Sequence, residues 1–173
     1  MGVCAIRIDE RLIHGQVATL WQGAWNCNRI MVIDSKSAND PILKSVLKIA
    51  CPTGVKLSVL EAEKAAANLV SGKYGRERIT IVTKTPQCLC DLIRGGYELE
   101  ADITVGNMSN GADKKRVSKN ICVTEADVEN FNYLSGLGYK LYSQMVPSEA
   151  PSPFMPMLEA CLLYTSPSPR DCS

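Results

Sequence analysis

Residues 29–60 read RIMVIDSKSANDPILKSVLKIACPTGVKLSVL, and their pattern indicates the class of fold. Its beginning, residues 29–34, is a nearly continuous apolar run, which is typical of a strand buried on both faces of a sheet. Asn39 is a candidate N-cap for a following helix, which has Pro41 in its first turn. Residues 55–60 then form a second apolar strand. A strand, a helix and a strand in this order predict part of a parallel sheet.

The same alternation continues along the rest of the chain. Further strands are expected at residues 3–9, 78–84, 102–108, 117–123 and 139–146. Further helices are expected at residues 15–23, 61–70 and 86–93 and after a capping-box-like start at 124–127. We therefore predict a three-layer α/β fold with a mostly parallel open sheet of about seven strands and helices on both faces. Ligands of such sheets bind beyond the carboxyl ends of the strands, which are followed here by residues 9–14, 34–40, 84–86 and 106–111.

The length of the chain suits one domain, which we assign to residues 1–147. After Pro147 the sequence becomes rich in proline, so we expect residues 148–160 to be irregular and to lie apart from the core. Residues 161–171, CLLYTSPSPRD, resemble the in-frame translation of a transposase sequencing adapter. We interpret residues 161–173 as a cloning or assembly scar without a domain, and a genuine flexible tail is the alternative.

Charge and hydropathy exclude several classes of partner. The chain has 19 basic and 18 acidic residues, a net charge of +1, whereas a nucleic-acid-binding protein normally carries a basic excess. The sequence contains no apolar run of about 18 residues, which a membrane-spanning helix would need. Charged residues begin at Arg7 and Asp9, so the N-terminus does not resemble a signal peptide. We expect a cytoplasmic protein with no nucleic-acid partner and no direct membrane insertion.

The eight cysteines indicate neither disulfides nor a metal site. Most lie in apolar runs such as VCAI, KIAC and NICV, where a free cysteine behaves as a small hydrophobic residue. No C-x-x-C pair is present, and Cys88 and Cys90 are the only close pair. The glycine motifs of P-loops and of dinucleotide-binding domains are also missing. We expect no cofactor and no metal, and a thiol or metal protein that uses Cys88 and Cys90 is an alternative.

The candidate site is the stretch RIDERLIHGQV, residues 7–17, between the first expected strand and the first expected helix. His14 is the only histidine in the chain, so any histidine chemistry takes place there. It stands at the expected N-terminus of a helix, where unpaired backbone N–H groups and the helix dipole favour an anion. A phosphoryl group on the imidazole suits this environment, and Gly15 allows the backbone to approach it closely.

Three charged residues before His14 fit the same chemistry. Arg11 and Arg7 are placed to neutralise the charge of a transferring phosphoryl group, because such transfer depends on positioning and electrostatics. Asp9 is placed to orient either an arginine or the second ring nitrogen of the histidine. A structural reading is also open, in which His14 only begins the helix and Arg11 is a solvated charge. The polar loop 106–111 is either part of the phosphate site or a plain turn.

The stretch RIDERLIHGQV resembles the signature of the IIB component of the mannose/fructose/sorbose class of bacterial sugar phosphotransferase systems. The likeness continues through residues 29–60, through DITVGNMSNG at 102–111 and to QMVP at 144–147. It therefore covers roughly residues 1–147. The motif itself shows no departure from the family pattern. The chain departs from it after Pro147, where the family continues with a charged, helical end.

The resemblance implies a phosphotransferase that acts as a phosphocarrier. His14 would take a phosphoryl group from a phosphorylated IIA protein, on the ring nitrogen nearer Cβ. It would then pass this group to a sugar bound by the membrane IIC and IID components. Arg11 and Asp9 match the arginine and aspartate of the family's active loop, and we expect Gly15, Gln16 and Arg7 to bind phosphate. The alternative is a non-catalytic α/β ligand-binding module with a structural His14.

Overall fold

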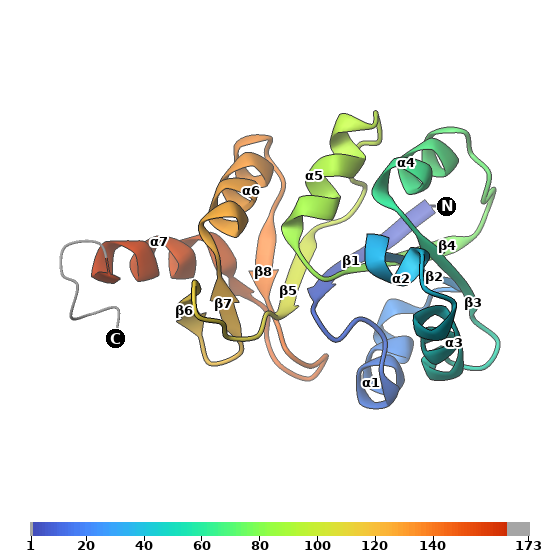
Figure 1. The fold of residues 1–173 in the computed structure, drawn as a ribbon, viewed down its shortest axis with the longest axis horizontal. Coiled ribbons are helices and arrows are strands. Elements are labelled where there is room, and N and C mark those ends of the chain that lie inside the picture. The colour runs from blue at the N-terminus through green and yellow to red at the C-terminus, as the bar shows by residue number, and fades with distance from the viewer. Residues whose placement is uncertain (1, 166–173) are drawn as a thin grey trace.

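A computed structural model describes residues 2–165 of the 173-residue chain. Its main sheet has seven strands in the order β3-β2-β4-β1-β5-β8-β9, and every neighbouring pair is parallel except β8 and β9 (Figure 1). The strands are β1 (Gly2–Asp9), β2 (Arg29–Ile33), β3 (Lys56–Leu60), β4 (Arg78–Thr83), β5 (Ile103–Asn107), β8 (Leu141–Ser143) and β9 (Ser152–Pro153). The predicted three-layer, mostly parallel α/β fold is confirmed.

Helices cover both faces of this sheet, as the continuous apolar strands predicted (Figure 1). One face carries α1 (Gly15–Trp25) and α3 (Pro41–Ala50), which contribute buried residues to one hydrophobic cluster. The other face carries α4 (Ala62–Val70), α5 (Pro86–Arg94), α6 (Glu125–Gly136) and α7 (Phe154–Thr165), which pack into a second cluster. The central strand β1 lies between β4 and β5, so its carboxyl end is surrounded by the ends of its neighbours.

The first crossover contains an additional short helix. The sequence predicted Asn39 as a helix N-cap, but Asn39 instead ends α2 (Ser35–Ala38), whose N-cap is Asp34. Asp40 begins α3, because its carboxylate accepts hydrogen bonds from the N–H groups of the first helical turn. Both caps are carboxylates, which satisfy the unpaired N–H groups and favour the positive end of the helix dipole.

Residues 117–123 were expected to form one strand of the main sheet, and this prediction is wrong. They belong to an antiparallel hairpin of β6 (Lys115–Ser118) and β7 (Ile121–Val123), which forms a separate two-stranded sheet. Lys119 and Asn120 separate the two short strands. The capping box at the start of α6 is present as predicted, since Thr124 and Asp127 bond reciprocally to each other's backbone N–H groups.

The end of the chain packs differently from the expectation. Residues after 147 were expected to be irregular and to lie apart from the core, yet β9 extends the sheet and α7 joins its core. Phe154 and Leu158 are fully buried, and the ring centroids of Phe154 and Phe131 lie 4.7 Å apart. Residues 161–165 continue α7, whereas residues 166–173 lie outside the described part of the chain. The adapter origin of residues 161–173 stays a prediction.

Candidate active site

The four segments that the sequence placed beyond strand ends meet at one edge of the sheet. They follow β2, β4, β1 and β5, which are consecutive neighbours in the sheet. Lys84, after β4, lies 3.7 Å from the carboxylate of Asp34, after β2. The segment with His14 follows β1 and therefore lies in the middle of this edge. The chain thus places its only histidine where parallel sheets bind their ligands.

His14 is the N-cap residue of α1 and is half-buried. Its backbone is extended, and its carbonyl oxygen accepts the first helical hydrogen bond, from the N–H of Ala18 at 2.9 Å. The imidazole does not cap the helix and makes no hydrogen bond to any residue that the structure describes. The residue at this position stands next to the unpaired N–H groups of the first helical turn, which attract an anion.

The surface next to His14 is open. Gly15 is exposed, and a Cβ atom built on it would meet no other atom within 4 Å. Its small size therefore leaves free space at the start of the helix instead of preventing a clash inside the protein. Gln16 lies in the same helical turn, and its side chain is outside the described part of the structure.

Asp9 holds Arg11 in one orientation. The carboxylate of Asp9 is completely buried and accepts hydrogen bonds from Nε and Nη2 of Arg11, at 2.9 and 2.8 Å, and from its backbone N–H at 3.1 Å. These hydrogen bonds raise the pKa of the Arg11 guanidinium. The Arg11 side chain is 33% exposed, so one side of its guanidinium is fixed by Asp9 while the other side reaches solvent. Of the two groups that Asp9 was expected to orient, the structure shows the arginine.

Arg7 has a different place from the one expected of a phosphate ligand. It is 1% exposed and lies under α1, with its guanidinium carbon 4.5 Å from the centroid of the Trp21 ring. Its two Nη atoms donate to the carbonyl oxygens of Gln144 and Met145 at 2.8 and 3.0 Å, and Nη2 lies 3.2 Å from a carboxylate oxygen of Asp9. Burial lowers the pKa of Arg7, against the opposing effect of Asp9. Arg7 therefore supports the loop from below and offers no donor to an outside anion.

The close fit around Arg7 also explains a glycine at the end of β5. A Cβ atom on Gly106 would lie 2.1 Å from Nη2 of Arg7, which is far inside van der Waals contact. Only glycine leaves room for this buried guanidinium at that position. The loop 106–111, which the sequence left as either a turn or part of the site, thus begins with a residue that shapes the support of Asp9.

The loop between Asp9 and His14 has a tight turn. Leu12 has a φ of 56°, a left-handed conformation that is costly for a leucine. Its N–H donates to the carbonyl oxygen of Asp9 at 2.9 Å, and its side chain is buried beside Ile13 in the cluster under α1. Burial of these two side chains stabilises the turn and fixes the direction in which the loop delivers His14 to the helix.

Sequence reasoning missed a contact between Glu10 and the loop 108–114. Lys114 lies 3.0 Å from the carboxylate of Glu10, and the N–H of Ser109 donates to that carboxylate at 3.1 Å. Glu10 lies inside the recognised motif, but no sequence pattern indicated its partners, which are 99 and 104 positions away. The polar character of the loop after β5 was the one feature of the sequence that could have pointed to this contact.

The thiol alternative finds little support. Cys90 is buried and Cys88 is half-buried, and burial raises the pKa of both thiols, that of Cys90 to about 11. A thiol with a raised pKa carries little reactive thiolate at neutral pH. Within residues 2–165, no group of three histidine, cysteine or acidic side chains is arranged to hold a metal ion.

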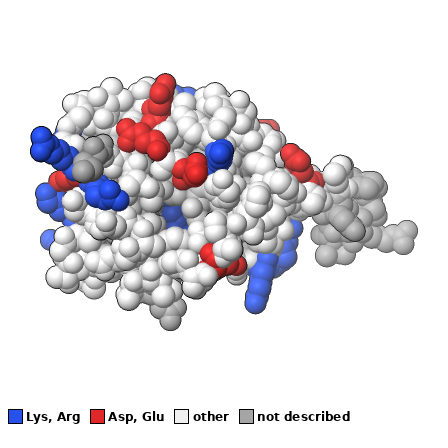
Figure 2. Space-filling model, turned by 180° about the vertical axis from the view of Figure 1, so that it is seen from behind, with Lys and Arg blue, Asp and Glu red and all other residues white. Residues whose placement is uncertain are grey.

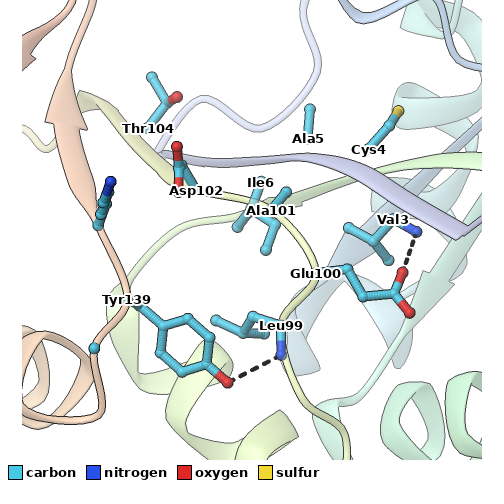
Figure 3. A pocket seen from close by; sticks show the side chains of 12 residues that line it. Val3, Cys4, Ala5, Ile6, Leu99, Glu100, Ala101, Asp102, Thr104 and Tyr139 are labelled. Atoms are coloured by element: carbon cyan, nitrogen blue, oxygen red, sulfur yellow. Dashed lines mark hydrogen bonds between the residues drawn. The ribbon is translucent and has the colours of Figure 1, made fainter.

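A pocket of about 620 Å³ lies at the opposite edge of the sheet, where β1 and β5 begin (Figure 3). Two of the backbone N–H groups that line it are paired inside the protein. The N–H of Val3 donates to Glu100 at 2.9 Å, and the N–H of Leu99 donates to the hydroxyl oxygen of Tyr139 at 3.2 Å. The titratable groups of the recognised motif lie at the other end of the strands. This pocket is therefore a weaker candidate than the edge that carries His14.

The family model for the sorbose-subfamily IIB component of the phosphotransferase system matches residues 3–165. The chain belongs to this family. The match includes α7, which lies beyond the end at residue 147 that the sequence suggested. The general role of this class of IIB component is phosphoryl transfer in sugar uptake. No helix in the described part of this IIB chain is long and apolar enough to span a membrane.

Individual relatives agree with this assignment. The IIB chain is 33% identical over 159 residues to the sorbose-specific EIIB component of Lacticaseibacillus casei, covering 92% of this chain and 96% of that one. It is 33% identical over 149 residues to the mannose-specific EIIAB component of Escherichia coli (strain K12), covering 86% of this chain and 46% of that one. The crystal structure of the IIBSor domain of the sorbose permease from Klebsiella pneumoniae superposes with a TM-score of 0.87 at 29% identity, covering 92% and 98% of the two chains.

One face of this IIB chain carries charged side chains of both signs. On the face shown in Figure 2, basic and acidic side chains both occur, with broad uncharged areas between them. A nucleic-acid-binding face would instead gather its basic side chains into a continuous stripe or patch.

Proposed function

We propose that His14 is the phosphoryl carrier of this IIB component. It accepts the group from a phosphorylated IIA protein in the cytoplasm and passes it to a sugar that enters through the membrane IIC and IID components. The observation that carries this proposal is the position of His14, a half-buried N-cap residue whose imidazole is unbonded among the described residues, on the loop where Asp9 fixes Arg11. A lone structural histidine would be expected to bond to its neighbours.

The chemistry consists of two substitutions at phosphorus. In the first, the lone pair of the imidazole nitrogen nearer Cβ attacks phosphorus, and the bond from phosphorus to the donor atom of IIA breaks with its electron pair. In the second, a sugar hydroxyl oxygen attacks, the phosphorus–nitrogen bond breaks, and the hydroxyl proton leaves to solvent or to the released imidazole. The negative charge on the phosphoryl oxygens has to be stabilised in both steps.

The residues around His14 have separate tasks in this scheme. The exposed end of Arg11 supplies a cation to the phosphoryl oxygens, and a planar guanidinium suits two of them at once. Asp9 positions Arg11 without touching the substrate, and Arg7 keeps the buried carboxylate of Asp9 compensated. The N–H groups that start α1 add a fixed positive field at no cost of reorganisation.

The proposal is tested by incubating the purified chain with phosphorylated IIA and mapping the modified residue. We expect one phosphoryl group per chain, stable in base and labile in acid, on the peptide that contains His14. A chain that stays unmodified in the presence of a competent donor would instead support the ligand-binding module with a structural His14. Onward transfer is followed with membranes that contain IIC and IID and a sugar of the class.

A further inference from the structure

Glu10 brings a second carboxylate into the active loop, directly between Asp9 and Arg11. Both of its oxygens are bonded by the loop that follows β5. Oε1 lies 3.0 Å from Nζ of Lys114, while Oε2 accepts the N–H of Ser109 at 3.1 Å and also the Ser109 hydroxyl. The Glu10 side chain is only 25% exposed, so this carboxylate depends on those partners for compensation.

Lys114 is itself held in place. Its ammonium group also donates to the carbonyl oxygen of Ser109 at 2.9 Å, and its side chain is 17% exposed. Lys114 immediately precedes the hairpin of β6 and β7, which is bonded to the end of β5. The N–H of Met108 donates to Asn120 at 3.0 Å, and the N–H of Cys122 donates to Met108 at 2.7 Å. The hairpin thus fixes the position of this cation beside the loop of His14.

The charges of the loop divide into two groups. Asp9, Arg7 and Arg11 together carry one net positive charge, and Glu10 with Lys114 carries none. Burial raises the pKa of Glu10, but the hydrogen bonds from Ser109 and Lys114 outweigh that effect and lower it overall. Glu10 is therefore ionised at neutral pH. Without Lys114 its charge would cancel the positive charge that Arg11 offers to a phosphoryl group.

We infer that Lys114 is a positioning residue for phosphoryl transfer, because it neutralises Glu10 and keeps that carboxylate on the loop after β5. Arg11 then bonds to Asp9 alone among the described carboxylates and stays available to the phosphoryl oxygens. This inference rests on the proposed role of His14. It assigns to the hairpin a task in the active site, although no hairpin residue belongs to the recognised motif.

The inference is tested with Lys114→Met, Glu10→Gln and the double variant, in the assay with phosphorylated IIA. Lys114→Met leaves an unpaired carboxylate, so we expect kcat/KM for the donor to fall about tenfold, mainly through KM, because like charge weakens encounter with an anionic group. The double variant removes both charges and should return to within about threefold of the wild type. Lys114→Arg should keep most of the activity.

Lys56→Met is the matched control, since Lys56 pairs with Glu77 at 2.8 Å at the opposite edge of the sheet, and we expect it to transfer normally. Thermal unfolding of every variant separates misfolding from a charge effect. A double variant as slow as Lys114→Met would overturn the inference. That result is expected if Lys114 only holds the loop after β5 in place and does not act by neutralising Glu10. Wild-type transfer by Lys114→Met would also overturn it while leaving the role of His14 intact. A wild-type chain that takes no phosphoryl group would overturn both.

Discussion

At the scale of single residues, the orientation of Arg11 is the feature that links structure to chemistry. Asp9 occupies one side of the guanidinium with two hydrogen bonds and leaves the other side at the surface. Such a fixed donor loses little entropy when it meets a phosphoryl group, which is why preorganised donors account for much of catalysis. Arg7 performs a different task in the same cluster. It is buried and bonded to backbone carbonyl oxygens, so it supports the loop that carries Asp9 and Arg11.

We expect Arg11→Ala to slow phosphorylation of His14 by about 10²- to 10³-fold, the usual effect of removing one preorganised donor. Arg11→Lys should recover only part of this loss, because an ammonium group lacks the coplanar N–H donors with which a guanidinium bonds two oxygens at once. Rapid-quench measurement of transfer from phosphorylated IIA checks both variants. A normal rate for Arg11→Ala would show that the loop stabilises the transfer by other means.

The residue scale also shows where sequence reasoning ends. The sequence predicted His14, Arg11 and Asp9 as a group, because they lie within six residues of one another in a recognisable motif. It did not indicate that Arg7 is buried, since a charged residue is normally solvated and only the folded segment around Gln144 covers this one. It gave no role to Lys114, because that contact requires β5 to lie next to β1 and a hairpin to follow β5.

At the scale of elements, the strands were predictable and the end of the chain was not. Continuous apolar runs gave the parallel strands at nearly their observed positions, since burial on both faces requires such runs. The proline-rich segment after Pro147 concealed α7. The buried face of α7 includes Phe154 and Leu158. Their packing can be recognised only when the core around Phe131 is known.

The role of α7 gives an expected change in stability. Phe154→Ala removes a fully buried ring that packs on Phe131, and we expect it to lower the free energy of unfolding by about 3–5 kcal/mol. Leu163→Ala on the same helix is the control, because Leu163 is 76% exposed and should change that energy by less than about 0.5 kcal/mol. Urea unfolding measures both. Equal stabilities would show that α7 does not belong to the folded core.

At the scale of the whole molecule, the two edges of the sheet carry different kinds of charge cluster. The edge at the carboxyl ends of the strands holds the candidate site. At the opposite edge, Glu77 bonds to Arg29 and Lys56 at the starts of β2 and β3. The hydrogen bond from Arg29 is the main cause that lowers the pKa of Glu77 from 4.5 to about 2. This second cluster lies at the edge opposite His14, so we assign it to stability.

The lowered pKa of Glu77 predicts a pH dependence of stability. A carboxyl whose pKa is lower in the folded state stabilises the fold above about pH 4.5, and this contribution is lost as the pH falls from there towards 2. Glu77→Gln should cost on the order of 1 kcal/mol at pH 7 and almost nothing at pH 2. Urea unfolding at pH 7, 5 and 3 checks this, with Glu129→Gln as an exposed control. A constant difference across these pH values would contradict it.

The carrier role of His14 is tested most directly by comparing the wild type with His14→Ala in the presence of phosphorylated IIA. Because the chain has no other histidine, the variant contains no imidazole that could take the group. We predict that the wild type gains acid-labile phosphate on the peptide with His14, and that His14→Ala gains none while keeping its fold by circular dichroism. Acid-labile phosphate on folded His14→Ala would contradict the carrier role.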